Sequence, residues 1–173
     1  MNVRLLGLAM AVGVLLPVAA QAQMLQPGLW ELTSSNMKVD DQNLPDLQLI
    51  LGQLQNQMTP QQRAALEKQG ITMGGKGIRV CLTPEQVKSD TIPLQDPQSG
   101  CKQEVTERMG NQWKFRFSCP KAQGTGVANF LSDREFTTKV NGTFNATGIQ
   151  QKGSLDTRAV WMGQDCGTVK PRA

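Results

Sequence analysis

Four cysteines are the residues in this chain with the clearest chemical potential: Cys81, Cys101, Cys119 and Cys166. Four thiolates bind zinc most often as close C-x-x-C pairs, and a single thiolate becomes a nucleophile when a neighbouring base activates it. Here the spacings are wide, and the 173 residues include no histidine to serve as that base. The residue types therefore favour two disulfides, and we predict no metal site, no cofactor and no catalytic residue.

The missing histidine also excludes Ser-His-Asp and Cys-His constellations and histidine-based zinc or copper sites. General acid–base catalysis would fall to carboxylates or lysines. Acid pairs such as Asp133/Glu135 or Asp40/Asp41 would suit a hydrolase of the two-carboxylate kind. Because 14 acidic residues produce many chance pairs, we favour a non-catalytic protein and keep the hydrolase as an alternative.

A hairpin is predicted between two alternating segments, 101–109 and 112–119, which flank Gly110-Asn111. A three-residue loop places odd-numbered positions opposite each other and sets Val105 against Phe115. A two-residue turn would set the same valine against a charged residue. Side-chain parity therefore favours the longer loop.

The same register selects one of the three possible disulfide connectivities. It places Cys101 opposite Cys119, and directly opposed residues in a non-hydrogen-bonded pair lie within disulfide range. We therefore predict a Cys101–Cys119 bond, and a Cys81–Cys166 bond follows by elimination.

The first 22 residues have the pattern of a secretory signal peptide. Arg4 provides a positive start, residues 5–20 carry no charge, and Ala20-Gln21-Ala22 is an A-x-A cleavage signal. Cleavage after Ala22 would leave a single domain of 151 residues (173 minus 22), residues 23–173, with no integral membrane segment. The expected location is the periplasm, or beyond the cell.

Hydrophobic patterning predicts an α+β fold, with a curved, mainly antiparallel sheet of about six or seven strands. The predicted strands are the two hairpin segments and residues 26–39, 76–82, 127–131, 134–140, 143–149 and 154–162. Turns are expected at 121–126, at Asn141-Gly142 and at 150–153, because these stretches are rich in glycine or match a hairpin signal.

Two or three short helices are predicted in the N-terminal half. Leucines at intervals of three and four mark an amphipathic helix over 44–58. Thr59 and Thr83 are each followed by proline, which is typical of a helix start, and Gln86 completes a capping box with Thr83.

An apolar groove between this sheet and the 44–58 helix is the predicted ligand site. The candidate groove or core residues are Trp30, Leu47, Leu51, Leu54, Trp113, Phe115, Phe117 and Trp161. The stretch 113–117 interleaves aromatic and basic residues, as some nucleic-acid platforms do. We favour simple alternation on a half-buried strand, which turns aromatic residues inward and basic ones outward. A net charge of +4 is small, so no nucleic-acid partner is expected.

Four motifs occur in order along the chain: "PGLWELT", "VCLTPEQ", the "WKFRFSC" strand and "WMGQDC". With them the chain resembles the bacterial domain-of-unknown-function family 3617, from about Gln26 to Cys166. The resemblance implies a secreted envelope protein with paired cysteines and implies no activity. The family's distinctive residues correspond here to Trp30, Cys81, Cys101, Cys119, Trp161 and Cys166, which we interpret as structural.

The function favoured by these observations is a non-catalytic periplasmic domain that binds an envelope protein or an apolar ligand. The alternatives are an envelope-directed hydrolase with Asp/Glu catalysis and a structural or assembly factor of the cell envelope. The sequence does not specify the partner or the oligomeric state.

Overall fold

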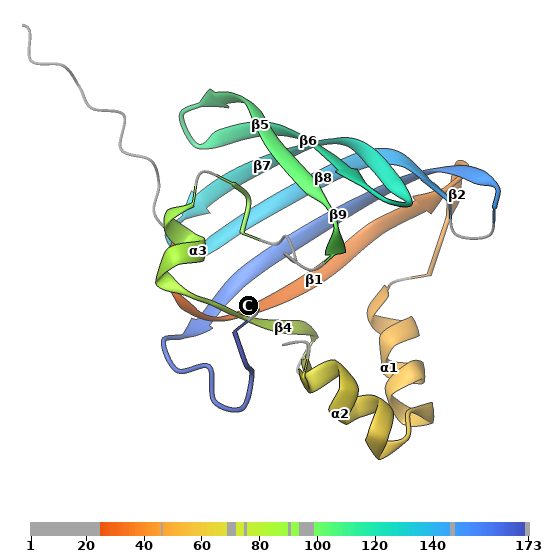
Figure 1. Ribbon diagram of the computed structural model, residues 1–173, viewed down its shortest axis with the longest axis vertical. Coiled ribbons are helices and arrows are strands. Elements are labelled where there is room, and N and C mark those ends of the chain that lie inside the picture. The colour runs from red at the N-terminus through yellow and green to blue at the C-terminus, as the bar shows by residue number, and fades with distance from the viewer. Residues whose placement is uncertain are drawn as a thin grey trace, which may run out of the picture.

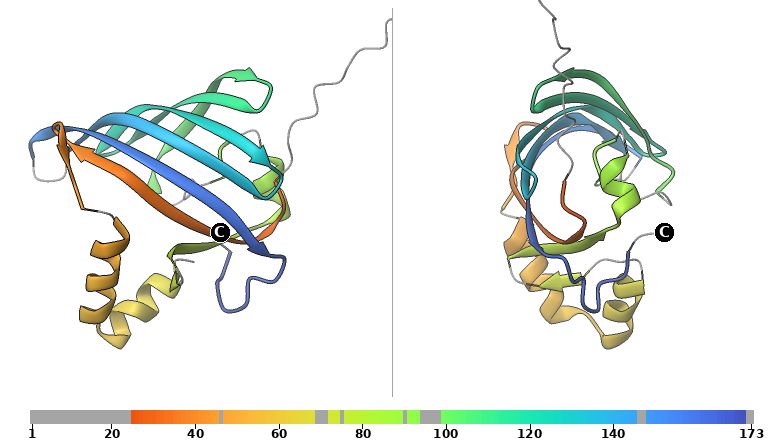
Figure 2. Two further views of the ribbon diagram at one scale, coloured as in Figure 1. Left: turned by 180° about the vertical axis from the view of Figure 1, so that it is seen from behind. Right: turned by 90° about the vertical axis from the view of Figure 1, so that its left-hand side faces the viewer.

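One curved antiparallel sheet dominates the computed structural model, which describes residues 25–45, 47–68, 72–74, 76–89, 91–93, 99–145 and 148–171. Eight of the nine strands within these residues follow the order β3-β4-β1-β9-β8-β7-β6-β5, and the ninth, the short β2, pairs with β1. The sheet curls into a half-barrel that does not close, because β3 and β5 remain at its two edges (Figure 1; Figure 2). The predicted α+β class is confirmed.

The strands are β1 (Gly28–Val39), β2 (Gln42–Asn43), β3 (Thr72–Gly74), β4 (Gly77–Leu82), β5 (Lys102–Met109), β6 (Gln112–Cys119), β7 (Ala122–Ser132), β8 (Glu135–Asn145) and β9 (Gln150–Gly163). The helices are α1 (Leu47–Gln57), α2 (Pro60–Lys68) and α3 (Pro84–Lys88). The short β2 and β3 were not predicted, and they bring the number of strands above the expected six or seven.

Strands β7, β8 and β9 are longer than predicted, because glycines expected in turns lie inside them. Gly142 pairs with Gly124 on one side and with Gly153 on the other. The predicted turns at 121–126, Asn141-Gly142 and 150–153 are therefore wrong. Neighbouring strands on both sides satisfy the backbone hydrogen bonds, and glycine inside a strand permits a tight bend or a close backbone approach instead.

The β5–β6 hairpin has a two-residue turn, but most of its strand pairing is that expected from a three-residue loop. Gly110, with φ 57°, and Asn111 form a two-residue turn, so Met109 pairs with Gln112. A bulge between Val105 and Glu107 then shifts the register and sets Val105 opposite Phe115. The predicted three-residue loop is wrong. The predicted pairing of odd-numbered with odd-numbered residues is right beyond the bulge, because the bulge adds one residue to β5.

Two disulfides join the cysteines in the pairs expected from that parity. Cys101 bonds to Cys119 across the hairpin, with Cα atoms 4.0 Å apart. Cys81 in β4 bonds to Cys166 beyond β9, with Cα atoms 5.6 Å apart and a sequence separation of 85. The second bond ties the C-terminal segment to β4, where Pro171 also forms a bridge with Cys81.

Aromatic residues fill one end of the half-barrel, which we call the closed end. Trp30 and Phe136 are completely buried, with ring centroids 5.4 Å apart. Phe130 lies between Phe136 and Trp113, at 5.7 and 4.8 Å. Leu25, Ile92 and Val87 of α3 pack against this cluster, and α3 lies within the opening of the curl (Figure 2). The fold therefore has its core here.

The segment before β1 fastens this closed end. The indole nitrogen of Trp30 donates to the Gln26 carbonyl (2.9 Å), and that of Trp161 donates to the Pro27 carbonyl (3.1 Å). Gln26 also reaches the β7–β8 turn, since its backbone and side chain both donate to Asp133. The "PGLW" stretch is thus a structural clasp, because each buried indole N–H finds an acceptor within it.

The helices begin where their capping residues predict. Thr83 and Gln86 form the expected capping box of α3, and Thr59 with Gln62 forms the same reciprocal pair at α2. Helix α1 begins at Leu47, later than expected, because the backbone of Leu44 hydrogen-bonds to Met37 in the β1–β2 hairpin. Within the described part of the chain, none of the helices combines the length and apolar character needed to cross a membrane.

Candidate functional site

The concave face of the half-barrel is uncharged along its central strands. In β1, β6, β7, β8 and β9, every second residue lies on the same face as the buried aromatic rings. These inward-facing residues alternate with outward-facing polar ones. These inward positions hold Trp, Phe, Val, Leu, Met, Ala, Gly, Ser, Thr, Cys or Gln. In β1, a register shift between Ser35 and Lys38 turns Met37 and Val39 inward. The face is therefore suited to apolar material.

A row of three glycines crosses this face away from the closed end. Register places Val39, Gly153, Gly142, Gly124 and Phe117 side by side on β1, β9, β8, β7 and β6. The three central positions have no side chain. The row therefore leaves bare backbone between a valine at one end and a phenylalanine at the other.

Phenyl rings cover two glycines of the row and leave the middle one open. A Cβ atom on Gly124 would lie 2.9 Å from the Phe117 ring, and one on Gly153 would lie 2.9 Å from the Phe144 ring. No side-chain atom is among the nearest neighbours of a Cβ on Gly142. The exposed backbone at Gly142 thus lies between two aromatic rings.

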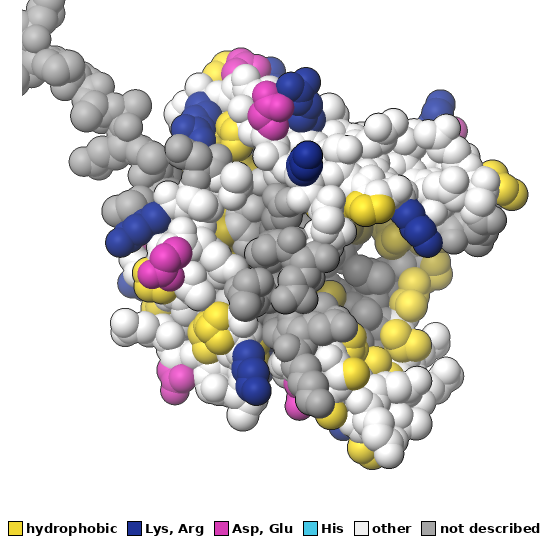
Figure 3. All heavy atoms as spheres, viewed as in Figure 1, with side chains coloured by type: hydrophobic (Ala, Val, Ile, Leu, Met, Phe, Trp, Pro, Cys, Tyr) yellow, Lys and Arg dark blue, Asp and Glu magenta, His cyan; other side chains and the backbone are white. Residues whose placement is uncertain are grey.

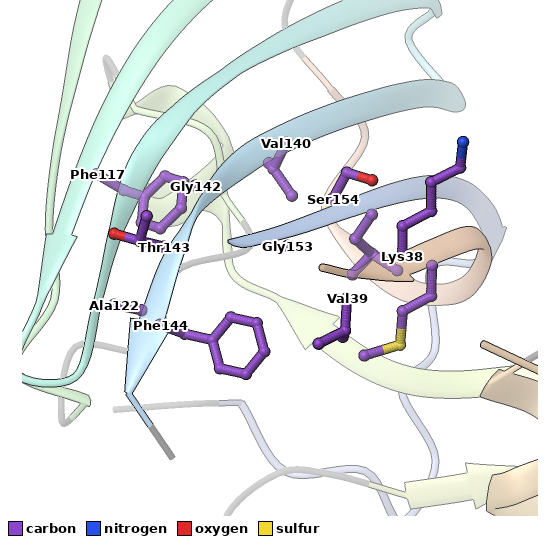
Figure 4. Close-up of a pocket in the computed structure, with 12 residues that line it drawn as sticks. Lys38, Val39, Phe117, Ala122, Val140, Gly142, Thr143, Phe144, Gly153 and Ser154 are labelled. Carbon is purple, nitrogen blue, oxygen red and sulfur yellow. The ribbon is translucent and has the colours of Figure 1, made fainter. Parts of the chain in front are cut away.

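An open pocket of about 160 Å³ occupies this position (Figure 4). We call it the concave pocket, and its lining residues are Met37, Lys38, Val39, Phe117, Ala122, Val140, Gly142, Thr143, Phe144, Gly153, Ser154 and Leu155. Lys38 is the one charged residue of this lining, and its amine points away from the phenyl rings in Figure 4. The apolar lining of the pocket is of the kind that small-molecule sites have, but its volume is below the roughly 300–1,000 Å³ typical of them.

Comparison with known proteins places the chain in a family. The family model described as "Protein of unknown function (DUF3617)" matches residues 25–166. The chain belongs to the DUF3617 family. An uncharacterised protein of Pseudomonas putida, "Uncharacterized protein in lpd-3 5'region", is 61% identical over 143 residues, which cover 80% of this chain and 99% of the relative. No solved structure matches the chain.

The acid pairs considered for a hydrolase lie outside the concave pocket of this DUF3617 protein. Glu135 binds Arg158 on the outer face (2.7 Å), and this hydrogen bond raises the pKa of Arg158. Asp133 accepts from the Gln26 side chain (2.7 Å). Asp40 accepts from the backbone of Lys152 at the strand ends (2.8 Å). The described lining of the pocket therefore offers no pair of carboxylates, and the described residues contain no cluster suited to a metal ion.

The predicted groove residues fall into three groups in the DUF3617 fold. Trp30, Trp113 and Phe115 are buried in the core, and Trp161 packs partly against it. Phe117 alone lines the concave pocket. Leu54 is 46% exposed on α1 and lines a different pocket, which α1 and α2 form together. The side chains of Leu47 and Leu51 lie outside the described residues.

Helices α1 and α2 lie outside the curl of the sheet, beside β1 and β4 (Figures 1 and 2). Leu54 lines a pocket formed by α1 and α2 and is not among the residues that line the concave pocket. Hydrophobic side chains gather around a hollow between the sheet and these helices (Figure 3). Leu49 and Ile50 on α1 are also exposed, at 67% and 38%.

The sequence reasoning missed most of the pocket residues of the DUF3617 domain. Val140 and Phe144 were predicted to lie in two strands separated by a turn at Asn141-Gly142, and Leu155 in a third strand after a turn at 150–153. A detectable signal was present, since Phe136, Thr138, Val140, Gly142 and Phe144 alternate without interruption. Treating the glycine as an inward strand position would have joined them on one face.

We expect the substitution Gly142→Ala to destabilise this DUF3617 protein by about 2 kcal/mol. A Cβ on Gly142 would collide with the backbone carbonyl of Gln123 in β7, and backbone cannot move aside as a side chain does. Urea denaturation of both proteins measures the difference.

The control is Gly52→Ala in α1, where an added Cβ meets no atom within 4 Å. This exchange should stabilise the protein by about 0.5–1 kcal/mol, because alanine favours a helix. Equal stabilities for wild type and Gly142→Ala would contradict the close strand approach described above.

Proposed function

We propose that this protein is an exported, non-catalytic binding domain that holds an apolar ligand in the concave pocket of its half-barrel. The observation that supports it is the uncharged inner face, which is filled by side chains at the closed end and ends in an open apolar pocket at Gly142. Phe136 and Phe144 lie eight residues apart on β8, about 26 Å along the strand. One strand thus contributes to the core at one end and to the pocket at the other.

The physical basis of binding is the removal of apolar surface from water, worth roughly 25 cal/mol per Å². Phe117 and Phe144 are only partly buried, and so are Val140, Leu155 and Val39 around them. A ligand that covers these side chains would gain this free energy. The disulfide that joins β5 to β6 holds the strand that carries Phe117, so the site needs little ordering before it binds.

Export of the protein is part of the proposal. It is supported by the signal-like residues 1–22 and by two cysteine pairs at disulfide distance, since disulfides persist mainly in oxidising compartments. Intact mass spectrometry of periplasmic material should give a chain that begins at Gln23 and lacks four hydrogens. A full-length chain with four free thiols, recovered from the cytoplasm, would contradict it.

Binding is tested with a neutral apolar fluorophore such as N-phenyl-1-naphthylamine. We expect its emission to rise on mixing with the purified protein and to saturate at one site. Native mass spectrometry of protein from the periplasm should also show a bound mass that organic extraction removes. A protein that binds neither the fluorophore nor any extractable ligand would overturn the proposed function.

Val140→Gln should weaken fluorophore binding about tenfold, which corresponds to roughly 1.4 kcal/mol. Val140 lines the concave pocket, and the amide would place polar atoms against a ligand that cannot hydrogen-bond to them. Titration of fluorescence gives the dissociation constants of variant and wild type.

The matched control is Lys139→Gln, one residue away on the opposite face. Lys139 is 68% exposed and lies 3.6 Å from Asp156. Its replacement should leave the dissociation constant unchanged. If the two variants bound equally, the ligand would not occupy the concave pocket.

A further inference from the structure

We infer that the concave pocket takes the methyl end of one alkyl or acyl chain, and that the head group of the ligand stays outside. This inference rests on the proposed function and specifies the ligand class. It follows from the volume of the pocket, from its width across the strands and from the absence of charge among its inward-facing residues.

The volume limits how much of a ligand can enter. The pocket measures about 160 Å³, and an engineered apolar protein cavity of about 150 Å³ holds one benzene molecule, a group of six carbons. A complete lipid is too large to enter whole. The end of a hydrocarbon chain, about six carbons long, fits this volume.

The width of the pocket favours a single chain. Val140 and Phe144, the inward neighbours of Gly142 on its own strand, are four residues apart, about 13 Å along β8. Their side chains take up part of this distance, and the Phe117 ring closes the side toward β6. The space over Gly142 thus lies between the Phe117 ring toward β6 and the Phe144 ring, which covers Gly153 on β9.

The charge of the lining determines which end of the ligand enters. The amine of Lys38 points away from the rings, and Thr143 and Ser154 alternate with the inward positions of their strands. An ionised group inside the pocket would lose its hydration without gaining a partner, which is costly. The terminus that enters must therefore be uncharged, whereas a charged head group remains in water.

Octanoate and octanedioate separate these possibilities. Both have eight carbons and a carboxylate at one end, but octanedioate carries a second carboxylate where octanoate ends in a methyl group. We expect octanoate to shift the amide resonances of Gly124, Gly142 and Gly153 in ¹⁵N spectra, while Gly110 and Gly167, in turns outside the pocket, stay unchanged. Octanedioate should bind at least tenfold more weakly.

The possible failures are distinguishable. Equal binding of the two acids, or binding of the neutral fluorophore without binding of octanoate, would overturn the chain-end inference and leave the proposed function standing. Failure of both octanoate and the fluorophore to bind would overturn the proposed function as well.

Gly153→Ala tests the Phe144 wall of the pocket. The new methyl group would lie 2.9 Å from the Phe144 ring and would displace it, so we expect at least fivefold weaker octanoate binding. Gly52→Ala, in α1, should bind as wild type does. A folding defect in Gly153→Ala would also weaken binding, so Phe144→Leu provides a second test. The smaller side chain should improve binding of a branched chain relative to octanoate, and an unchanged ratio would contradict the inference.

Discussion

Replacing Cys81 and Cys166 together by alanine should lower the free energy of unfolding by about 4 to 5 kcal/mol. The bond closes a loop with a sequence separation of 85, and a cross-link across a long loop restricts the unfolded chain most in the entropic account. It also fastens the C-terminal segment to β4. Urea denaturation without reductant, followed by circular dichroism, measures the loss.

The companion variant replaces Cys101 and Cys119, whose separation is 18. The same entropic account gives about 3 kcal/mol for this shorter loop. The order of the two losses is the test. A larger loss for the hairpin bond would mean that strain or local packing, and not loop length, determines what each disulfide contributes.

Trp30→Ala should cost about 3 to 5 kcal/mol, the range for truncating a large aromatic residue in a core. Trp30 has no exposed surface, contacts Phe136 and donates its indole hydrogen to Gln26. The variant therefore leaves a cavity at the closed end and an unused acceptor in the clasp before β1. Thermal and urea denaturation should both show the loss.

Leu131→Ala serves as the control, because Leu131 is 57% exposed on β7. It should change stability by less than about 0.5 kcal/mol. If Trp30→Ala unfolded as late as this control, the aromatic cluster would not be the main source of stability.

The two ends of the half-barrel differ in how their interior is filled. Large rings, α3 and the clasp at Gln26 fill the closed end. The other end has glycines where further core residues would otherwise stand, and the space they leave is the concave pocket. A sheet closed and filled along its whole length would bury more apolar surface, but it would leave no concave pocket.

Several features of this protein followed from its sequence alone. Alternation along 112–119 placed Trp113, Phe115 and Phe117 on one face, and parity with Val105 brought Cys101 opposite Cys119. The capping residues Thr59 and Thr83 marked helix starts. These features are local or pairwise, so the spacing of residue types is enough to specify them.

Other features depended on which strands lie side by side. Asn141-Gly142 has the composition of a turn, yet β7 and β9 pair with it on both sides and keep β8 extended. The bulge near Thr106 let a two-residue turn coexist with the parity of a three-residue loop. The concave pocket formed only when three glycines distant in sequence came into register. Propensity describes one segment at a time, whereas the hydrogen bonds and close contacts of neighbouring strands decided whether each glycine ends a strand or bends it.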